Sequence, residues 1–403
     1  MLKNETYFID SCDDVELNIK RESKLEYRIT YDDSKEMKAI VFIIGGYGAN
    51  AHMAFVDFNR KLIAKKHNVV AVSVLYHCFC QRKSDIEKYS AQTAFMEDDL
   101  PKFRSILNEF NINAELLNEY TTWKYWDVLN KTIENLKEKK ILPKSYKVHL
   151  DGSLVPPNNE YQNYGIMAAI DHINALKDIM KNFPQFKRLP KIYGGGSYGG
   201  YLALLISKIS PWYVDGVIDN SGGALPPFQY FLGKEFDKGD CVFYDSNTIV
   251  HGQVKTYWTR KDPNSPYYFA DENYLIRALL NKDHLILQNQ KNKNIVYTSY
   301  HSTKDLMVPF EYKNQLMQIY RFLGYRVDFY VIDEKDIDGK YIKDALHGGG
   351  ISDKALFNKE LPIMLEKLKD KKISMKRNSI SYPCKNKVFT FKDKGNKFIL
   401  EII

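Results

Sequence analysis

The sequence predicts an α/β protein with a doubly wound, mostly parallel sheet. Two observations lead to this prediction. Apolar runs such as residues 39–44 and 69–76 lack the polar alternation of a half-exposed strand, and such runs are typical of strands buried on both faces. Segments with helical spacing lie between these runs, as the connections between parallel strands require. The chain has 403 residues, enough for one large domain with an insertion.

The elements are expected in a regular order. Residues 7–9 and 25–29 are rich in aromatic and β-branched residues and indicate antiparallel strands within residues 5–31. Residues 164–182 indicate a helix, because their apolar side chains recur at helical spacing on one face. Further strands are expected at residues 39–44, 69–76, 191–194, 214–219, 295–300 and 327–332, and further helices at residues 54–66, 201–209, 310–323 and 352–368.

The domain organisation follows from where this pattern breaks. Residues 78–163 are charged, show helical periods and lack a buried strand of comparable strength, which predicts a helical insertion or cap. Residues 222–290 are aromatic and irregular and favour a lid-like segment or pocket wall within the core. The core is expected over residues 1–77 and 164–369, followed by a basic C-terminal extension, residues 370–403, that adds an edge strand or hairpin.

Composition points to a cytoplasmic protein. No run of 18 or more apolar residues occurs, so no membrane span is expected, and the first residues lack the features of a signal peptide. The five cysteines are odd in number and scattered, which is typical of reduced thiols. Cys78 and Cys80 form a pair without a second pair, so no metal site is expected.

The net charge of +8 leaves two interpretations open. Lysine-rich stretches such as residues 137–140 and 369–372 are typical of a solvated surface, whereas a basic balance also attracts an anionic substrate or partner. No nucleic-acid-binding motif is present, so no nucleic-acid partner is expected.

Residues 195–199, Gly-Gly-Ser-Tyr-Gly, form the strongest motif. Gly-x-Ser-x-Gly between a predicted strand and a predicted helix is typical of a sharp turn that exposes a nucleophilic serine. Glycines are needed there because a Cβ atom would clash with the neighbouring strand and helix. The Gly-Lys-Ser/Thr of a phosphate-binding loop does not follow. Ser197 is therefore the candidate nucleophile.

A nucleophilic serine needs a histidine base and a carboxylate that orients this base. In the chain order serine, acid, histidine, the candidate base is His347, which precedes three glycines in a loop before the last helix. Asp305 follows the strand at 295–300 and is the candidate acid. Asp219, after the preceding strand, is the alternative acid, and His301 is a candidate for the pocket lining.

Acyl transfer also needs donors for the negative charge that develops on the carbonyl oxygen. The residue after the nucleophile, Tyr198, is expected to give one backbone N–H. The glycine-rich loop at residues 45–48 follows an early buried strand and is expected to give the other, from Tyr47, with Gly46 beside the pocket.

These motifs resemble those of a known family. Residues 195–203 closely resemble the nucleophile turn of the prolyl oligopeptidase branch of the α/β-hydrolases, and residues 305–309, Asp-Leu-Met-Val-Pro, resemble its acid loop. The resemblance covers about residues 38–76 and 164–368, apart from the lid-like segment 222–290. It implies an α/β-hydrolase fold without a metal or organic cofactor and with the triad Ser197, Asp305 and His347. The whole chain is also similar to an uncharacterised bacterial group of α/β-hydrolase-like proteins.

The chain departs from that branch in three ways. It shows no β-propeller repeat, Gly45 and Gly46 stand where His-Gly is usual, and the insertion and lid are long. These departures count against a peptidase and favour a serine hydrolase that cleaves a carboxylic ester through an acyl-enzyme. A small peptidase or amidase, an acyltransferase and a non-catalytic binding protein stay open as alternatives. The basic balance and the 29 tyrosines are compatible with a small anionic or sugar-linked acyl substrate.

Overall fold

A computed structural model describes residues 1–48, 51–236, 239–369, 371 and 378–403 of the chain. The chain divides into two compact units. Unit 1 comprises residues 1–79, 163–227 and 269–403, and unit 2 comprises residues 80–162 and 228–268. No helix within the described residues is both long and apolar enough to cross a membrane.

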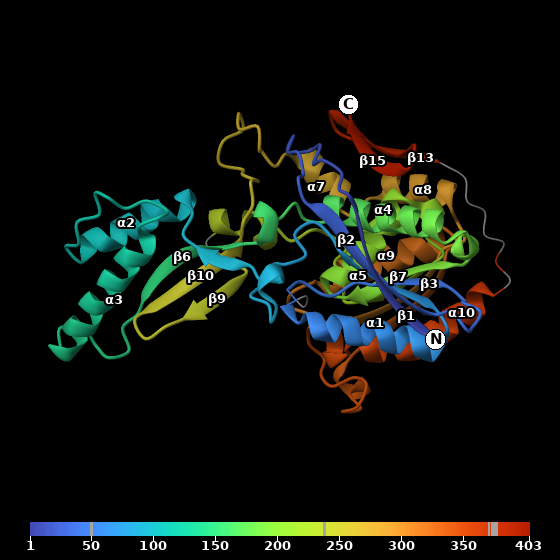
Figure 1. Cartoon of the computed structure of the whole chain (residues 1–403), viewed down its shortest axis with the longest axis horizontal. Coiled ribbons are helices and arrows are strands. Elements are labelled where there is room, and N and C mark those ends of the chain that lie inside the picture. The colour runs from blue at the N-terminus through green and yellow to red at the C-terminus, as the bar shows by residue number, and fades with distance from the viewer. Residues whose placement is uncertain (49–50, 237–238, 370, 372–377) are drawn as a thin grey trace. The chain divides into compact units, whose positions relative to one another are not determined.

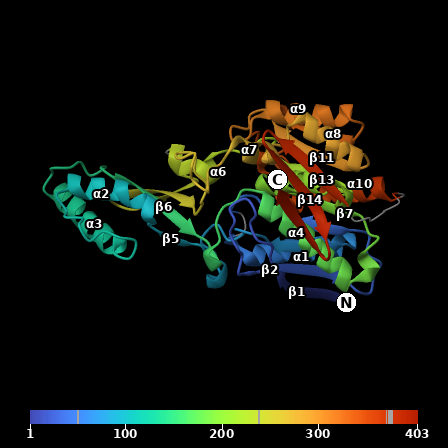
Figure 2. The ribbon, with the colours of Figure 1, turned by 90° about the horizontal axis from the view of Figure 1, so that it is seen from above.

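Unit 1 is built on an eight-stranded sheet in the order β1-β2-β4-β3-β7-β8-β11-β12 (Figures 1 and 2). β2 is antiparallel to both β1 and β4, and all the other neighbours are parallel. The predicted doubly wound, mostly parallel sheet is therefore confirmed. The strands are β1 Leu2–Asp10, β2 Lys24–Asp32, β3 Ile40–Ile43, β4 Val70–Leu75, β7 Lys191–Gly196, β8 Gly216–Asn220, β11 Val296–Ser302 and β12 Arg326–Ile332.

Helices cover both faces of this sheet, with α1 on one side and α4 on the other (Figure 1). On the first face, Ile63 of α1 and Phe357 of α10 share a buried apolar cluster with Val41 and Ile192 of the sheet. Burial of this kind is the main force that holds the layers together. The helices of unit 1 are α1 Met53–His67, α4 Ile166–Asn182, α5 Tyr198–Ile209, α7 Asp271–Arg277, α8 Lys282–Lys291, α9 Phe310–Phe322 and α10 Asp353–Leu368.

The C-terminal extension forms a separate antiparallel sheet of β13 (Ser379–Cys384), β14 (Lys387–Lys394) and β15 (Lys397–Ile402). The prediction of an edge strand or hairpin for this extension is thus replaced by a three-stranded sheet, and residues 370 and 372–377 lie outside the described part. Asn174 of α4 binds β15, because its side chain donates to the carbonyl of Phe398 at 3.0 Å and accepts from its N–H at 2.7 Å.

Unit 2 adds strands to the helical insertion or cap that the sequence predicts at residues 78–163. It contains a four-stranded sheet in the order β5-β6-β10-β9, in which β6 and β10 are parallel. The strand β6 was missed because polar and apolar residues alternate at its start, as in a strand with one exposed face. The strands are β5 Gln92–Ala94, β6 Val148–Val155, β9 Cys241–Tyr244 and β10 Thr248–Val254, and the helices are α2 Leu100–Glu109, α3 Thr122–Glu138 and α6 Gln229–Leu232.

The segment 222–290 is more regular than the sequence suggests. It holds β9 and β10, which pair with each other and extend the unit 2 sheet, and it holds α7 and α8 of unit 1. The short helices α7 and α8 are largely polar and bury few apolar residues, including Ile276 and Leu285, so they gave no clear helical stripe.

The contact between α4 and the C-terminal sheet gives a testable prediction. Asn174→Ala leaves the N–H and C=O of Phe398 buried without these partners, which should lower the free energy of unfolding by about 2 kcal/mol. The exposed Asn135→Ala on α3 is the control, with an expected change below about 0.5 kcal/mol. Denaturant unfolding measures both, and equal effects would contradict the assignment.

Candidate active site

The turn between β7 and α5 holds Ser197 in a strained backbone conformation. Its φ of 54° and ψ of −119° lie where residues with a side chain are rarely found. The N–H of Ser197 donates to the carbonyl of Asn220 at 2.7 Å, and the carbonyl of Ser197 accepts from the N–H of Tyr201 at 3.0 Å. These bonds fix the turn to the end of β8 and to the first turn of α5.

Close packing explains why glycines flank this serine. A Cβ atom at Gly195 would lie 1.8 Å from the carbonyl oxygen of Ile44, and a Cβ atom at Gly199 would lie 1.9 Å from the same oxygen. At Gly200 a Cβ atom would lie 2.2 Å from Oδ1 of Asp219. A side chain at any of these positions would displace its neighbours, so the predicted need for glycine is confirmed.

His347 lies between Ser197 and Asp305. Its Nε2 is 2.7 Å from Oγ of Ser197, and its Nδ1 is 2.7 Å from Oδ2 of Asp305. The three residues follow β7, β11 and β12, and parallel strands bring their carboxyl ends to one edge of the sheet. Asp305 is fully buried, whereas the side chain of His347 is 18% exposed. The three side chains that the sequence singled out therefore form one hydrogen-bonded chain.

The loop that carries His347 is held by the end of β8. The N–H of Gly348 donates to Oγ of Ser221 at 3.1 Å, and its carbonyl accepts from Nδ2 of Asn220 at 2.9 Å. Residues 348–350 all have positive φ, which glycine adopts at the lowest cost. The sequence did not single out Asn220 and Ser221, and their only signal was their position after a buried strand.

The acid loop is organised around the carboxylate of Asp305. Its Oδ1 accepts from the N–H groups of Met307 and Val308, both at 2.9 Å, which leaves Oδ2 for His347. Burial alone raises the pKa of the Asp305 carboxyl, but the hydrogen bond and charge of His347 outweigh it, so this pKa lies below its ordinary value. The carboxylate is therefore ionised and suited to orient an imidazole.

His301 of β11 contacts the acid loop, residues 305–309. Its ring is fully buried, and Nε2 lies 2.9 Å from the carbonyl of Val308, to which it can donate, and 3.7 Å from Oδ2 of Asp305. Burial and the charge of Lys313 lower the pKa of His301, which favours a neutral ring. Instead of lining open space, His301 supports the turn that presents Asp305.

Asp219 is occupied by other partners. Its Oδ2 lies 2.5 Å from Nζ of Lys313 and accepts from Oγ of Ser299 at 2.6 Å, and its Oδ1 accepts from the N–H of Gly222 at 2.8 Å. Both charged side chains are fully buried, so each needs the other. Asp219 therefore belongs to a buried ion pair with Lys313, and Asp305 is the carboxylate that contacts His347.

The side chains of Tyr47 and Tyr198, whose N–H groups are the predicted oxyanion donors, contact each other. The rings of Tyr47 and Tyr198 meet edge to face with centroids 5.7 Å apart. A Cβ atom at Gly46 would lie 3.5 Å from Cβ of Ser197, so this loop passes close to the serine. Tyr198 is the first residue of α5, where an α-helix leaves its N–H groups without an intrahelical acceptor.

Asp353 is a further charged group at the turn, and no motif in the sequence indicates a role for it. Its Oδ1 accepts from the N–H of Gly196, directly before the nucleophile, at 3.0 Å. Burial raises the pKa of Asp353 to about 6. The sequence indicated only that this residue opens the last helix, because nothing local connects it to a turn more than 150 residues earlier.

Comparison with protein families gives one full-length match. The model described as "Protein of unknown function (DUF2920)" matches residues 5–402. The chain belongs to this family. A comparison with curated proteins gives no match.

Solved structures similar to this DUF2920 protein include a peptidase and an esterase. An acylaminoacyl peptidase from Pyrococcus horikoshii is 14% identical, with a TM-score of 0.46, over 93% of this chain and 42% of the peptidase. Esterase 2 from Thermogutta terrifontis is 12% identical, with a TM-score of 0.41, over 93% of this chain and 97% of the esterase. The chain thus spans less than half the length of the peptidase. These likenesses carry no activity over to this chain, and any chemistry has to be argued from its own residues.

The packing at the turn yields a prediction about stability. Gly199→Ala places a methyl group against the carbonyl of Ile44, so it should lower the free energy of unfolding by more than about 3 kcal/mol or prevent folding. Gly196→Ala is the matched control, because its nearest neighbour would be 3.4 Å away, and its cost should stay near 1 kcal/mol. Thermal unfolding measures both variants. A Gly199→Ala protein as stable as the control would disprove the close approach.

Proposed function

We propose that this DUF2920 protein is a serine hydrolase that cleaves a carboxylic ester through an acyl-enzyme. The observation that carries the proposal is the chain of two 2.7 Å contacts from Ser197 through His347 to Asp305. A base nitrogen at hydrogen-bond distance from a hydroxyl, oriented in turn by a carboxylate, is the arrangement that makes serine nucleophilic.

In the proposed mechanism, Oγ of Ser197 attacks the ester carbonyl carbon while Nε2 of His347 takes the hydroxyl proton. The tetrahedral intermediate expels the alcohol, which receives that proton from Nε2, and the acyl group stays on Ser197. A water molecule then attacks the acyl carbon while Nε2 of His347 takes its proton. The second tetrahedral intermediate breaks its bond to Oγ of Ser197, which receives that proton, and the carboxylic acid leaves. Asp305 stays ionised throughout and stabilises the protonated imidazole.

The carbonyl oxygen becomes negative in both steps and needs preorganised donors. The backbone N–H groups of Tyr198 and Tyr47 are proposed for this role. The ring of Tyr198 is buried beside Tyr47, Tyr164 and Tyr76, with the nearest centroid distance 5.2 Å, to Tyr164. Such packing supports the role, because a donor is effective when it does not have to reorganise during the reaction.

An ester is proposed over an amide on chemical grounds. An ester carbonyl has less resonance stabilisation than an amide carbonyl, and an amide nitrogen has to be protonated before it can leave, so an ester needs less from the general acid. The triad and two N–H donors are sufficient for such a substrate.

The nucleophile is tested by Ser197→Ala. This variant should lose hydrolysis of p-nitrophenyl esters by at least about 10⁴-fold, because no other group supplies the attacking oxygen. It should also lose labelling by a fluorophosphonate probe. The control Ser381→Ala, at an exposed position on β13, should keep both the ester hydrolysis and the labelling. Retained esterase activity in Ser197→Ala would refute the nucleophile, and faster cleavage of aminoacyl anilides by the parent enzyme would refute the ester preference.

Two aspartate variants separate the proposed orienting acid from the buried ion pair. Asp305→Asn should lower kcat by about 10³–10⁴-fold with little loss of stability, because His347 loses the acceptor that fixes its tautomer. Asp219→Asn should instead lower the free energy of unfolding by about 3 kcal/mol, since Lys313 is left buried without its partner. Steady-state kinetics and denaturant unfolding of both variants give the comparison. The reverse pattern would assign the acid to Asp219.

A further inference from the structure

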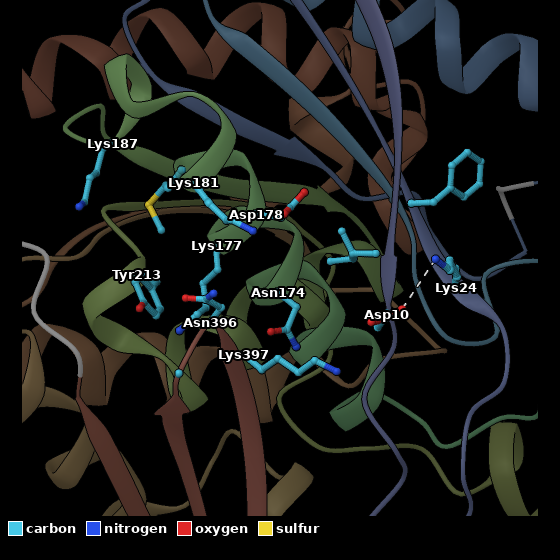
Figure 3. Close-up of a pocket in the computed structure, with 14 residues that line it drawn as sticks. Asp10, Lys24, Asn174, Lys177, Asp178, Lys181, Lys187, Tyr213, Asn396 and Lys397 are labelled. Carbon is cyan, nitrogen blue, oxygen red and sulfur yellow. Dashed lines mark ion pairs between the residues drawn. The ribbon is translucent and has the colours of Figure 1, made fainter.

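A hollow of about 660 Å³ lies in unit 1 where α4 meets β1 and the β14–β15 turn (Figure 3). None of the residues of the candidate active site lines it. Its volume is within the range of about 300–1,000 Å³ that is usual for small-molecule sites. We call it the lysine-lined hollow after the five lysines in its wall, which are Lys24, Lys177, Lys181, Lys187 and Lys397.

The wall of this hollow carries excess positive charge. Against the five lysines stand two lining aspartates, Asp10 and Asp178. Asp10 pairs with Lys24 at 3.8 Å, and Oδ2 of Asp178 accepts from the hydroxyl of Tyr27 at 2.6 Å and from Asn182 at 3.0 Å. Each of the two carboxylates in the wall thus already has an ion-pair or hydrogen-bond partner.

The lysines in the wall differ in whether they have an ion-pair partner. Lys177 forms an ion pair with Asp393, whose Oδ1 also accepts from the hydroxyl of Tyr213. Across the described part of the chain, no ion-pair partner is found for Lys181, Lys187 or Lys397. Figure 3 shows that they come from different sides of the hollow, with Lys181 on α4, Lys187 beyond its end and Lys397 on β15.

The end of α4 explains one of these three charges. A helix C-terminus carries a partial negative charge, and Lys181 lies in the last turn of α4, where it complements this charge. Lys187 and Lys397 belong to other segments of the chain. Cations that surround one hollow repel each other, and an anion with several charges would remove this repulsion.

We propose that the lysine-lined hollow binds a small organic molecule that carries at least two phosphate charges. An ammonium group is a compact point charge with three donors and is suited to phosphate oxygens. Ile9 and Met180 add apolar surface to the wall for the organic part of the ligand. The ligand is thus expected to use both kinds of surface, and its site is separate from the proposed hydrolytic one.

Binding is tested by isothermal titration calorimetry of the full chain with ATP, fructose 1,6-bisphosphate, pyrophosphate and citrate. At low ionic strength, ATP or the sugar bisphosphate should bind saturably with one site per chain and more tightly than pyrophosphate. The tighter binder of the two indicates whether the organic part of the ligand is a nucleoside or a sugar. Raising the salt concentration should weaken the binding, because the contacts are exposed charges.

Charge reversal locates the site. Lys187→Glu combined with Lys397→Glu should raise the dissociation constant at least tenfold, and the double glutamine variant should raise it less. Lys61→Glu combined with Lys65→Glu on α1 makes the same change in net charge at two exposed lysines outside the hollow and should change it less than twofold. Thermal unfolding confirms that all variants are folded.

Three results would overturn the proposal. If neither organic phosphate binds saturably, the proposed site does not exist. Equal weakening by the double Lys61→Glu and Lys65→Glu variant indicates attraction to the overall charge alone. Citrate or pyrophosphate binding as tightly as the organic phosphates contradicts the proposed ligand class. The measurement reports binding only, so it is independent of whether Ser197 is a nucleophile.

Discussion

The site depends on one close approach, between the carbonyl of Ile44 and the turn that follows β7. This oxygen occupies the space where Cβ atoms of Gly195 and Gly199 would lie, at 1.8 and 1.9 Å. The N–H of Ile44 donates to the carbonyl of Gly194 at 2.9 Å, so β3 and β7 stay paired up to the turn. The chain consequently passes from β7 to α5 through the single residue Ser197, which adopts a positive φ. The loop after Ile44 then passes beside the serine, where the proposed oxyanion donor Tyr47 lies.

A second layer of buried polar groups holds the remaining parts of the site. Asn220 and Ser221 at the end of β8 bind the loop of His347, and His301 of β11 contacts the turn of Asp305. Beneath them, the Asp219–Lys313 ion pair is fully buried. Buried polar groups are costly unless they are paired, so this layer fits together in few ways. Because its loops are fixed in this manner, the proposed triad would lose little entropy in reaching a reactive geometry.

The sequence anticipated the core of unit 1 better than the rest of the chain. Strands buried on both faces give continuous apolar runs, and each run such as residues 39–44 marks a strand of the large sheet. In unit 2 this signal is weak, because strands such as β6 expose polar residues like His149 and Asp151 between apolar ones. The pairing of β6 with β10 joins segments about 100 residues apart, and no local pattern specifies such a partner.

The sequence by itself determined the order of the main elements and the three side chains that come together. The Gly-x-Ser-x-Gly motif reflects a local steric requirement. The loops of Asp305 and His347 follow parallel strands, whose carboxyl ends lie at the same edge of the sheet. Only the tertiary structure decided between Asp305 and Asp219, because that choice depends on Lys313, a residue of α9 that takes Asp219 as its partner. It alone connected Asp353 with Gly196 and assembled the lysine-lined hollow from α4, β1 and β15. Contacts of this kind depend on distance in space, and the order of residues along the chain does not encode them locally.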